Sequence, residues 1–220
     1  TQEAWAMLGV LTDKFSKRPY NKIVVNGKER VGRLTQLAQN SHLIEWLEPH
    51  QESNLYWVEK FNTDGRIVWQ ASHSELSTYE YTYDENGKPQ SVLIKIIWPE
   101  LKNIMTVTPR FEACNPSERQ DCYKFQEVAI HMLITAERDE NGKIVGGTME
   151  NTFFTQDGRT FIKEQKIRVS YPNDNAMRIE FEGFGEPWAY VDAWQEYRIE
   201  NGTLVWETCR TFGKHSCKKD

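Results

Sequence analysis

Asn-Gly and Asp-Gly pairs, flanked by runs of β-branched and aromatic residues, limit the folds open to this chain more than any other feature. They occur at Asn26-Gly27, Asp64-Gly65, Asn86-Gly87, Asn141-Gly142, Asp157-Gly158 and Asn201-Gly202. Such a pair between two strand-like runs is the strongest short-range signal of a β-hairpin. Hairpins that follow one another along the chain predict an antiparallel β-meander over about residues 20–211.

A long, open and flat meander would leave exposed edges, so we expect it to close or to curl strongly. The predicted fold is mainly β: an antiparallel up-and-down β-barrel or strongly curled, calycin-like meander. A barrel of about eight to ten strands leaves room for one small ligand. Because no linker, long-period repeat or low-complexity tract divides the chain, we expect a single domain over residues 1–220.

The N-terminal segment has a helical pattern instead. Apolar residues recur there at three- and four-residue spacing: Trp5, Leu8, Leu11 and Phe15. We predict an N-terminal α-helix from about Gln2 to Ser16, ended before Pro19.

Charge and hydropathy restrict the partners. The net charge is −5 and the signs are interspersed, so no basic stripe indicates nucleic acid. No run of about 18 apolar residues indicates a membrane-spanning segment. Trp, Tyr and Phe make up 12% of the chain, which agrees with a sheet protein rich in aromatic strand residues.

The cysteines form two pairs of equal spacing, Cys114 with Cys122 and Cys209 with Cys217. We expect disulfides that staple the C-terminal tail, each local bridge contributing about 2–3 kcal/mol, although spacing does not select the connectivity. Zinc binding and free buried thiols are the alternatives. Disulfides indicate an oxidising compartment, hence a periplasmic or extracellular location. The chain begins without a signal-like leader, as expected of a mature exported protein and equally of a cytosolic one.

The stretch LYWVEKFNTDGRIVWQASHSEL, residues 55–76, contains the candidate site. If Asp64-Gly65 is a two-residue loop, the register sets Phe61 opposite Val68, Glu59 opposite Gln70 and Trp57 opposite Ser72. Trp57 and Phe61 then share a face with the polar pair. A buried carboxylate must be hydrogen-bonded or paired. We therefore predict a ligand site with Trp57 and Phe61 as apolar walls, in which Glu59 and Gln70 hold the polar part of the ligand.

Two alternatives remain for this stretch. Glu59 faces solvent if the N-terminal helix or a loop covers Trp57 and Phe61. A three-residue loop would shift the register and separate Glu59 from Gln70. His131, in the run KFQEVAIHMLITAER, is the fifth candidate for ligand binding, and its alternative is an ordinary half-exposed strand residue.

Signatures of catalysis are scarce. The chain has no G-x-S-x-G elbow, no H-E-x-x-H and no glycine-rich phosphate loop. The histidines show no metal-site spacing. We therefore assign no catalytic residue and predict no metal site.

Several motifs resemble the CpcT/CpeT group of phycobilin chromophore lyases. They are LYWVEKF and RIVWQASHSEL after a helix that ends in FSKRPYN, and further on GKIVGGTMENTFF, GRTFIKEQKIRV and GFGEPWAYVDAWQEYRI. The resemblance implies a calycin-like β-barrel whose cavity holds a linear tetrapyrrole, delivered to a cysteine of an acceptor phycobiliprotein. Glu59 matches the acidic residue of the family's Y-x-E-Q motif, and Gln70 matches the glutamine of its R-Q-R motif. Lys60, Trp69 and Ala71 depart from these motifs.

Three functions follow as hypotheses. The first is a lipocalin-like carrier of an elongated, largely apolar molecule, and the second is a chromophore lyase-like enzyme. The third is a secreted interaction module with a packed barrel and exposed aromatic anchors for a protein partner. The expected partners are thus a small hydrophobic ligand and an acceptor or partner protein. A bilin or other tetrapyrrole is the ligand that the resemblance implies, and no other cofactor is indicated.

Overall fold

The computed structural model describes residues 11–16, 22–72, 76–97, 128–154, 160–182 and 190–212. One short α-helix, α1 (Asp13–Ser16), and a 3-10 turn, η3 (Ala38–Asn40), accompany the strands. The strands are β1 (Lys22–Val25), β2 (Lys28–Gln36), β3 (His42–Glu48), β4 (Gln51–Phe61), β5 (Ile67–Ser72), β6 (Leu76–Tyr83), β7 (Pro89–Ile97), β8 (Val128–Arg138), β9 (Ile144–Phe154), β10 (Thr160–Asn173), β11 (Ala176–Glu182), β12 (Tyr190–Glu200) and β13 (Thr203–Phe212).

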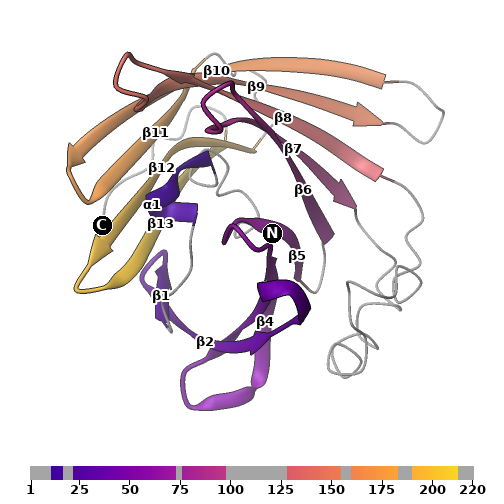
Figure 1. Ribbon diagram of the computed structural model, residues 1–220, viewed down its shortest axis with the longest axis vertical. Helices are drawn as coiled ribbons and strands as arrows, with labels where there is room; N and C mark the ends of the chain where they lie inside the picture. The colour runs from indigo at the N-terminus through magenta and orange to yellow at the C-terminus, as the bar shows by residue number, and fades with distance from the viewer. Residues whose placement is uncertain are drawn as a thin grey trace.

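The strands form a closed barrel in sequence order, as Figure 1 shows. Each strand pairs antiparallel with the next, and β1 closes the ring against β13 in parallel. The parallel pair follows from the odd number of strands in the ring. In a meander with an odd number of strands, the first and last run in the same direction. A mainly β barrel is thus confirmed, but antiparallel pairing throughout is wrong at the closing pair.

The predicted number of eight to ten strands is also wrong, because the described residues supply thirteen. Several turns between strands contain no Asn-Gly or Asp-Gly pair, so the predicted number of turns was too low. The β2–β3 loop passes through η3, the β3–β4 loop turns at His50 with a positive φ of 63°, and the β10–β11 loop turns at Asp174 and Asn175. None of these three connections contains glycine, so the Asn-Gly and Asp-Gly signal could not predict them.

Two kinds of hairpin loop use the glycine pairs. Asn26-Gly27 and Asn201-Gly202 are two-residue loops in which both residues have positive φ, as type I′ turns require. The other described pairs belong to three-residue loops in which only the glycine has positive φ: Gly65, Gly87 and Gly142. Asp157-Gly158 lies outside the described residues.

The barrel interior is the main hydrophobic core. Buried side chains from every strand except β2 form one cluster, and its largest members include Trp46, Phe61 and Tyr197. Strand β2 contributes Gly32, where a Cβ atom would lie only 3.1 Å from the Trp46 ring. A second, smaller buried cluster on the opposite face of β3–β6 comprises Leu43, Val58, Trp69, Ala71 and Leu76. The β4–β5 hairpin is therefore apolar on both faces, which explains its mixed alternation.

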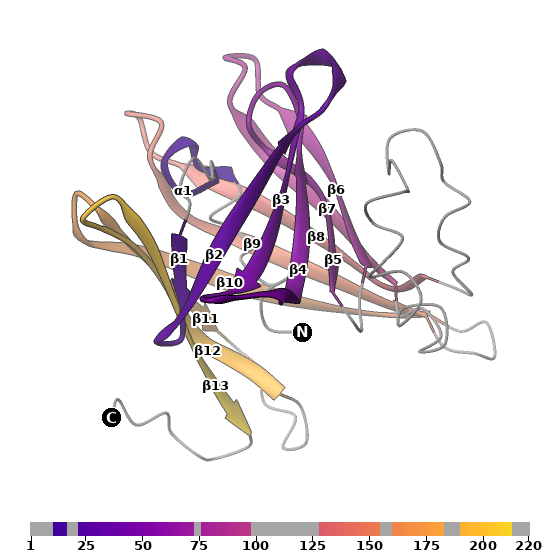
Figure 2. The same ribbon diagram turned by 90° about the horizontal axis from the view of Figure 1, so that it is seen from below.

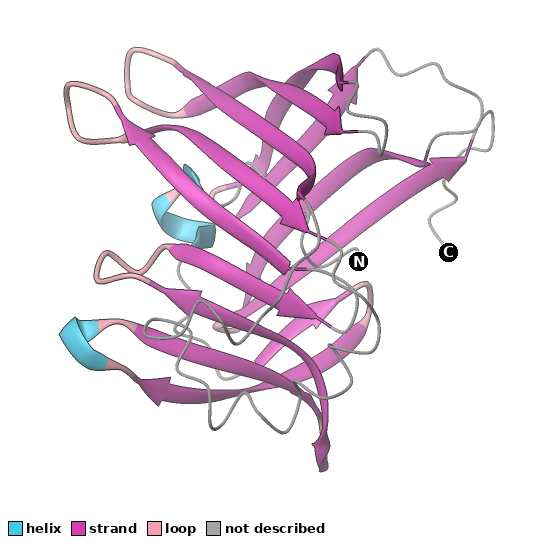
Figure 3. Ribbon diagram, turned by 90° about the vertical axis from the view of Figure 1, so that its right-hand side faces the viewer, coloured by secondary structure: helices cyan, strands magenta, loops and turns pink. Residues whose placement is uncertain are grey.

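One end of the barrel, which we call the hairpin mouth, is formed by the loops at residues 37–41, 62–66, 84–88, 139–143, 174–175 and 201–202. Residues 11–16, here called the plug, lie at this mouth, and Figure 3 shows α1 beside the hairpin loops. Leu11 and Phe15 are buried in the main core. Figure 2 shows the strands of the barrel tilted across one another, as closure requires.

The predicted helix over residues 2–16 is confirmed only at its C-terminal end, and the described residues show no longer N-terminal helix. Only Asp13–Ser16 is α-helical, and residues 2–10 lie outside the described residues. The helix begins where it does because Thr12 caps it: the Phe15 amide donates to Thr12 Oγ1 at 3.0 Å. The apolar spacing of Leu11 and Phe15 reflects their contact with the barrel interior. No helix in the described part of the chain is long and apolar enough to cross a membrane.

Close strand packing at Gly147 gives a first prediction. A Cβ atom there would lie 2.4 Å from the backbone oxygen of Thr135 on the paired strand β8. Gly147→Ala should therefore cost about 1–3 kcal/mol. For a chain of this size, that corresponds to a Tm lower by roughly 2–4 °C per kcal/mol. Thermal unfolding followed by circular dichroism measures it, with Thr148→Ala as the control. Equal stability of Gly147→Ala and the wild type would contradict the β8–β9 register.

Candidate functional site

The β4–β5 hairpin places Glu59 opposite Gln70, as predicted, although its loop is not the predicted one. The Asn62 amide donates to the Arg66 carbonyl at 2.9 Å, which makes the loop three residues long. Phe61 therefore pairs with Ile67 and not with Val68. A β-bulge at Val68 then adds one residue to β5 and restores the register, so Trp57 faces Ser72.

Glu59 is inside the barrel. Its exposed fraction is 1%, so the solvent-facing alternative is wrong. Trp46 Nε1 on the neighbouring strand β3 donates to Glu59 Oε1 at 2.5 Å. The Trp46 and Trp57 rings lie 5.9 Å apart, centroid to centroid, with a tilt of 30°. The carboxylate thus sits against two indoles, one of which supplies a hydrogen bond, as a buried charge requires.

The polar row continues from Glu59 across β5 and β6. Gln70 is buried and accepts a hydrogen bond from the Tyr79 hydroxyl at 3.1 Å. Ser77 pairs with Gln70 in the sheet and is also buried, since its exposed fraction is 1%. Glu59, Gln70, Ser77 and Tyr79 therefore line one wall of the interior with alternating polar groups.

Among the described residues, four polar atoms in the interior are buried without a hydrogen-bond partner: Ser77 Oγ, Asn151 Oδ1, Gln165 Nε2 and Trp206 Nε1. The alternation of side chains along each strand places these atoms inside the barrel. Ser77 shares a face with Tyr79, Asn151 with Met149, and Gln165 with Ile167, all of which belong to the interior cluster or its wall. Gln165 pairs with Met149, so Asn151 and Gln165 are diagonal neighbours on one face. Unpaired buried polar groups are rare in native proteins, and each needs an explanation.

The remaining predicted residues divide between the two faces. Phe61 is fully buried, and its ring stacks on His42 at 4.8 Å. His131 lies on the outer face of β8, opposite Lys95 and apart from the other four predicted residues. Its pKa is lowered, chiefly by burial and then by Lys95, while Glu80 acts in the opposite direction. The interior site thus contains Trp57, Glu59, Phe61 and Gln70, but not His131.

The cysteine prediction stays a prediction. Cys114, Cys122 and Cys217 lie outside the described residues, and Cys209 is in β13 with its side chain outside the description. Across the described ranges, no three His, Cys, Asp or Glu side chains gather in a way that would hold a metal ion.

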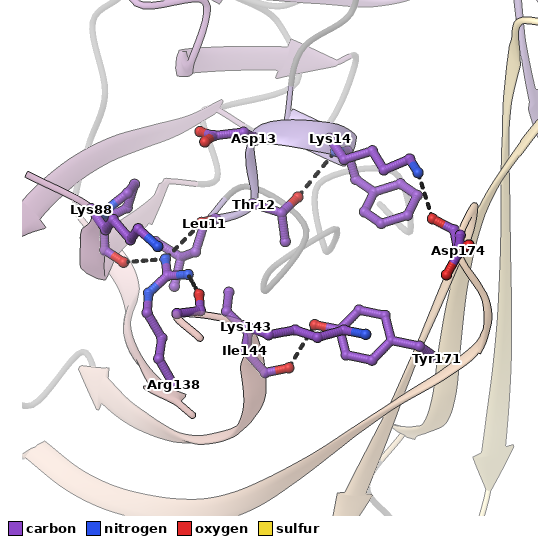
Figure 4. Close-up of a pocket in the computed structure, with 13 residues that line it drawn as sticks. Leu11, Thr12, Asp13, Lys14, Lys88, Arg138, Lys143, Ile144, Tyr171 and Asp174 are labelled. Atoms are coloured by element: carbon purple, nitrogen blue, oxygen red, sulfur yellow. Dashed lines mark hydrogen bonds between the residues drawn. The ribbon is translucent and has the colours of Figure 1, made fainter. Parts of the chain in front are cut away.

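A second feature is a pocket of about 320 Å³ at the hairpin mouth, between the plug and the barrel rim. Figure 4 shows Arg138 extending toward the plug and the Lys143 side chain lying along the Tyr171 ring. The Lys143 ammonium lies 3.8 Å from the centre of that ring. Burial raises the pKa of Tyr171, and its hydroxyl donates to the Ile144 carbonyl at 2.6 Å.

Sequence reasoning missed Trp46, Tyr79, Asn151, Gln165 and the pocket. The sequence does contain a signal for Asn151 and Gln165, because each is a polar residue that interrupts the apolar row on the inward face of its strand. Trp46 carried none, since its role depends on pairing β3 with β4 so that its indole reaches Glu59.

No protein-family model matches the chain, and no curated protein shows significant similarity to it. What the structure shows is the mixed, closed β-barrel itself.

The contact between Trp46 and Glu59 predicts a strong energetic coupling. We expect a double-mutant cycle with Trp46→Phe and Glu59→Gln to give about 1.5–3 kcal/mol, the range for hydrogen bonds to charged groups. Urea unfolding of the four proteins measures it. A coupling near zero would mean that Glu59 is satisfied without the indole.

The two histidines described above predict how stability depends on pH. Burial lowers the pKa of both His42 and His131, so the unfolded state binds protons more readily. The free energy of unfolding should therefore fall as the pH drops below about 6.5, the unperturbed histidine value. Urea unfolding at about pH 8 and about pH 5 should show a smaller loss for His42→Gln/His131→Gln than for the wild type. An equal loss in both proteins would assign the acid sensitivity to carboxylates.

Proposed function

We propose that the barrel binds a small, elongated and largely apolar molecule in its interior. The observation that carries this proposal is the set of unpaired polar atoms on Ser77, Asn151, Gln165 and Trp206. Each such atom costs about 1–3 kcal/mol if nothing satisfies it. A ligand or bound water that supplies the missing partners would remove that cost.

The width of the barrel supports the proposal. Eight strands enclose an interior that side chains just fill, whereas sixteen or more leave an aqueous channel. A closed ring of thirteen described strands lies between these limits. Large aromatic side chains and the plug occupy part of the interior, and the unpaired polar atoms lie among them on β6, β9, β10 and β13.

The wall chemistry favours a ligand with several hydrogen-bonding groups on an apolar frame. Glu59 and Asn151 Oδ1 offer acceptors, while Gln165 Nε2 and Trp206 Nε1 offer donors, and aromatic rings surround them. A linear tetrapyrrole has this character, with pyrrole N–H donors and lactam carbonyl acceptors. We therefore propose a bilin-like ligand, in line with the chromophore-lyase resemblance. Binding alone, as a carrier, needs no residue beyond those named, and delivery to an acceptor protein would be a further step.

Fluorescence titration tests the proposal. Trp46, Trp57 and Trp206 lie in the interior, so a ligand there should quench the intrinsic emission saturably. The probes are biliverdin, haem and palmitate. Asn151→Leu/Gln165→Met removes two unpaired polar atoms with little change of shape. We expect this variant to bind the best probe about tenfold more weakly and to unfold at a higher temperature without ligand.

Glu59→Gln separates a binding carboxylate from a structural one. It keeps the shape of the side chain and removes the charge, and we expect weaker quenching by biliverdin. Glu45→Gln is the matched control, because Glu45 is a buried carboxylate on the outer face of adjacent β3, paired with Arg33 at 2.8 Å. Absence of quenching by all three probes would overturn the proposal and favour a packed barrel that acts as a protein-interaction module.

A further inference from the structure

Three hairpin loops at the mouth share one construction. They are Asn62–Arg66, Asp84–Lys88 and Asp139–Lys143. In each, the side-chain oxygen of the first residue accepts hydrogen bonds from the backbone amides of the third and fifth residues, at 2.9–3.0 Å. The fifth residue is basic in all three, so equivalent positions of the mouth carry Arg66, Lys88 and Lys143.

One of these cations already binds a carboxylate at the mouth. Arg66 NH2 donates to Asp13 Oδ1 of the plug at 2.5 Å, and its NH1 donates to the Thr12 carbonyl at 3.4 Å. The Arg66 side chain is 7% exposed, whereas that of Asp13 is 81% exposed. The fifth position of this loop type therefore presents a cation where a carboxylate can reach it from outside the barrel.

The other two cations lack such a partner. In the described part of the chain, the Lys88 and Lys143 ammonium groups form no ion pair within 4.0 Å. Both line the pocket together with Arg138. Two of these cations lie at Gly142: Lys88 Nζ lies against it, and Arg138 donates to its carbonyl at 2.9 Å. The Lys143 ammonium lies instead on the Tyr171 ring. Lys88 and Arg138 therefore give this side of the pocket a positive charge.

Arg138 is held in place by main-chain contacts and not by an acid. Its NH2 group donates to the carbonyls of Pro89 at 2.7 Å and Leu11 at 3.2 Å, and its Nε is buried without a partner. By contrast, Arg198 on the outer face of β11–β13 has Glu196 and Glu207 within 3.1 Å.

The carboxylates near the pocket have other contacts. Asp13 pairs with Arg66, while Asp84 and Asp139 accept the loop amides. Asp174 lines the far side, where its carbonyl and Asn175 Oδ1 accept from Lys14. Between the cations and this far side, the pocket has an apolar lining from Leu11, Phe15, Pro89 and Ile144.

We propose that this pocket binds a small amphiphilic carboxylate. Its anionic group lies beside Lys88 and Arg138, and its apolar part lies against the plug and Ile144. The volume of about 320 Å³ is at the small end of ligand pockets, which fits a medium-chain or aromatic acid. This site does not require a ligand in the barrel interior.

Calorimetric titration with octanoate tests the proposal, with octanamide as the uncharged comparator. Lys88→Gln/Lys143→Gln keeps the loop amides and removes both charges, and should weaken octanoate binding about tenfold while leaving octanamide unchanged. The matched control is Lys28→Gln/Lys166→Gln, which removes the same charge from exposed positions on β2 and β10. Octanoate should shift the amide NMR signals of Gly87 and Gly142 and not those of Gly27 and Gly202.

Several outcomes would overturn it: no octanoate binding by the wild type, equal weakening in the control variant, or shifts away from Gly142. The interior proposal is separable, because Asn151→Leu/Gln165→Met should leave octanoate affinity unchanged. If Asn151→Leu/Gln165→Met weakens octanoate binding and Lys88→Gln/Lys143→Gln does not, the acid binds in the barrel interior and the mouth site is wrong.

Discussion

Closure of the ring between β1 and β13 is the contact on which the rest of the structure depends. It joins residues 181 positions apart through a short parallel ladder, Ile23 with Leu204 to Val25 with Trp206. Asn26 extends the closure, because its amide donates to the Trp206 carbonyl at 2.9 Å and its side chain accepts from the Thr208 amide at 2.8 Å. Without this pairing, both strands would be open edges and the interior would be accessible to solvent.

Closing so many strands makes a wide interior, and its contents follow from that width. Large aromatic side chains and the plug fill much of it, yet Glu59, Gln70, Asn151 and Gln165 are buried there as well. Glu59 and Gln70 have hydrogen-bond donors in Trp46 and Tyr79, whereas Asn151 Oδ1 and Gln165 Nε2 have no partner among the described residues. The plug, in turn, is held at the mouth by Arg66 and Arg138, and Lys88 and Lys143 line the pocket beside it.

The β4–β5 hairpin shows how far sequence reasoning reached and where it failed. The alternation of Trp57, Glu59 and Phe61 was predictable, because side chains alternate between faces with a period of two. The loop length was not, since Asn62 closes a three-residue turn through its own side chain. The bulge at Val68 compensated for that error, so the Glu59–Gln70 pair was predicted correctly from an incorrect loop.

The sequence by itself determined the hairpins at the described Asn-Gly and Asp-Gly pairs, the alternation of faces and the mainly β class, because turn residues and strand periodicity act between near neighbours in the chain. The tertiary structure decided the number of strands, the parallel closure and the short extent of α1. It also decided that Trp46 meets Glu59, that His131 lies outside, and that Lys88 and Lys143 meet at one mouth. These contacts join distant segments, and their geometry depends on how the whole ring closes.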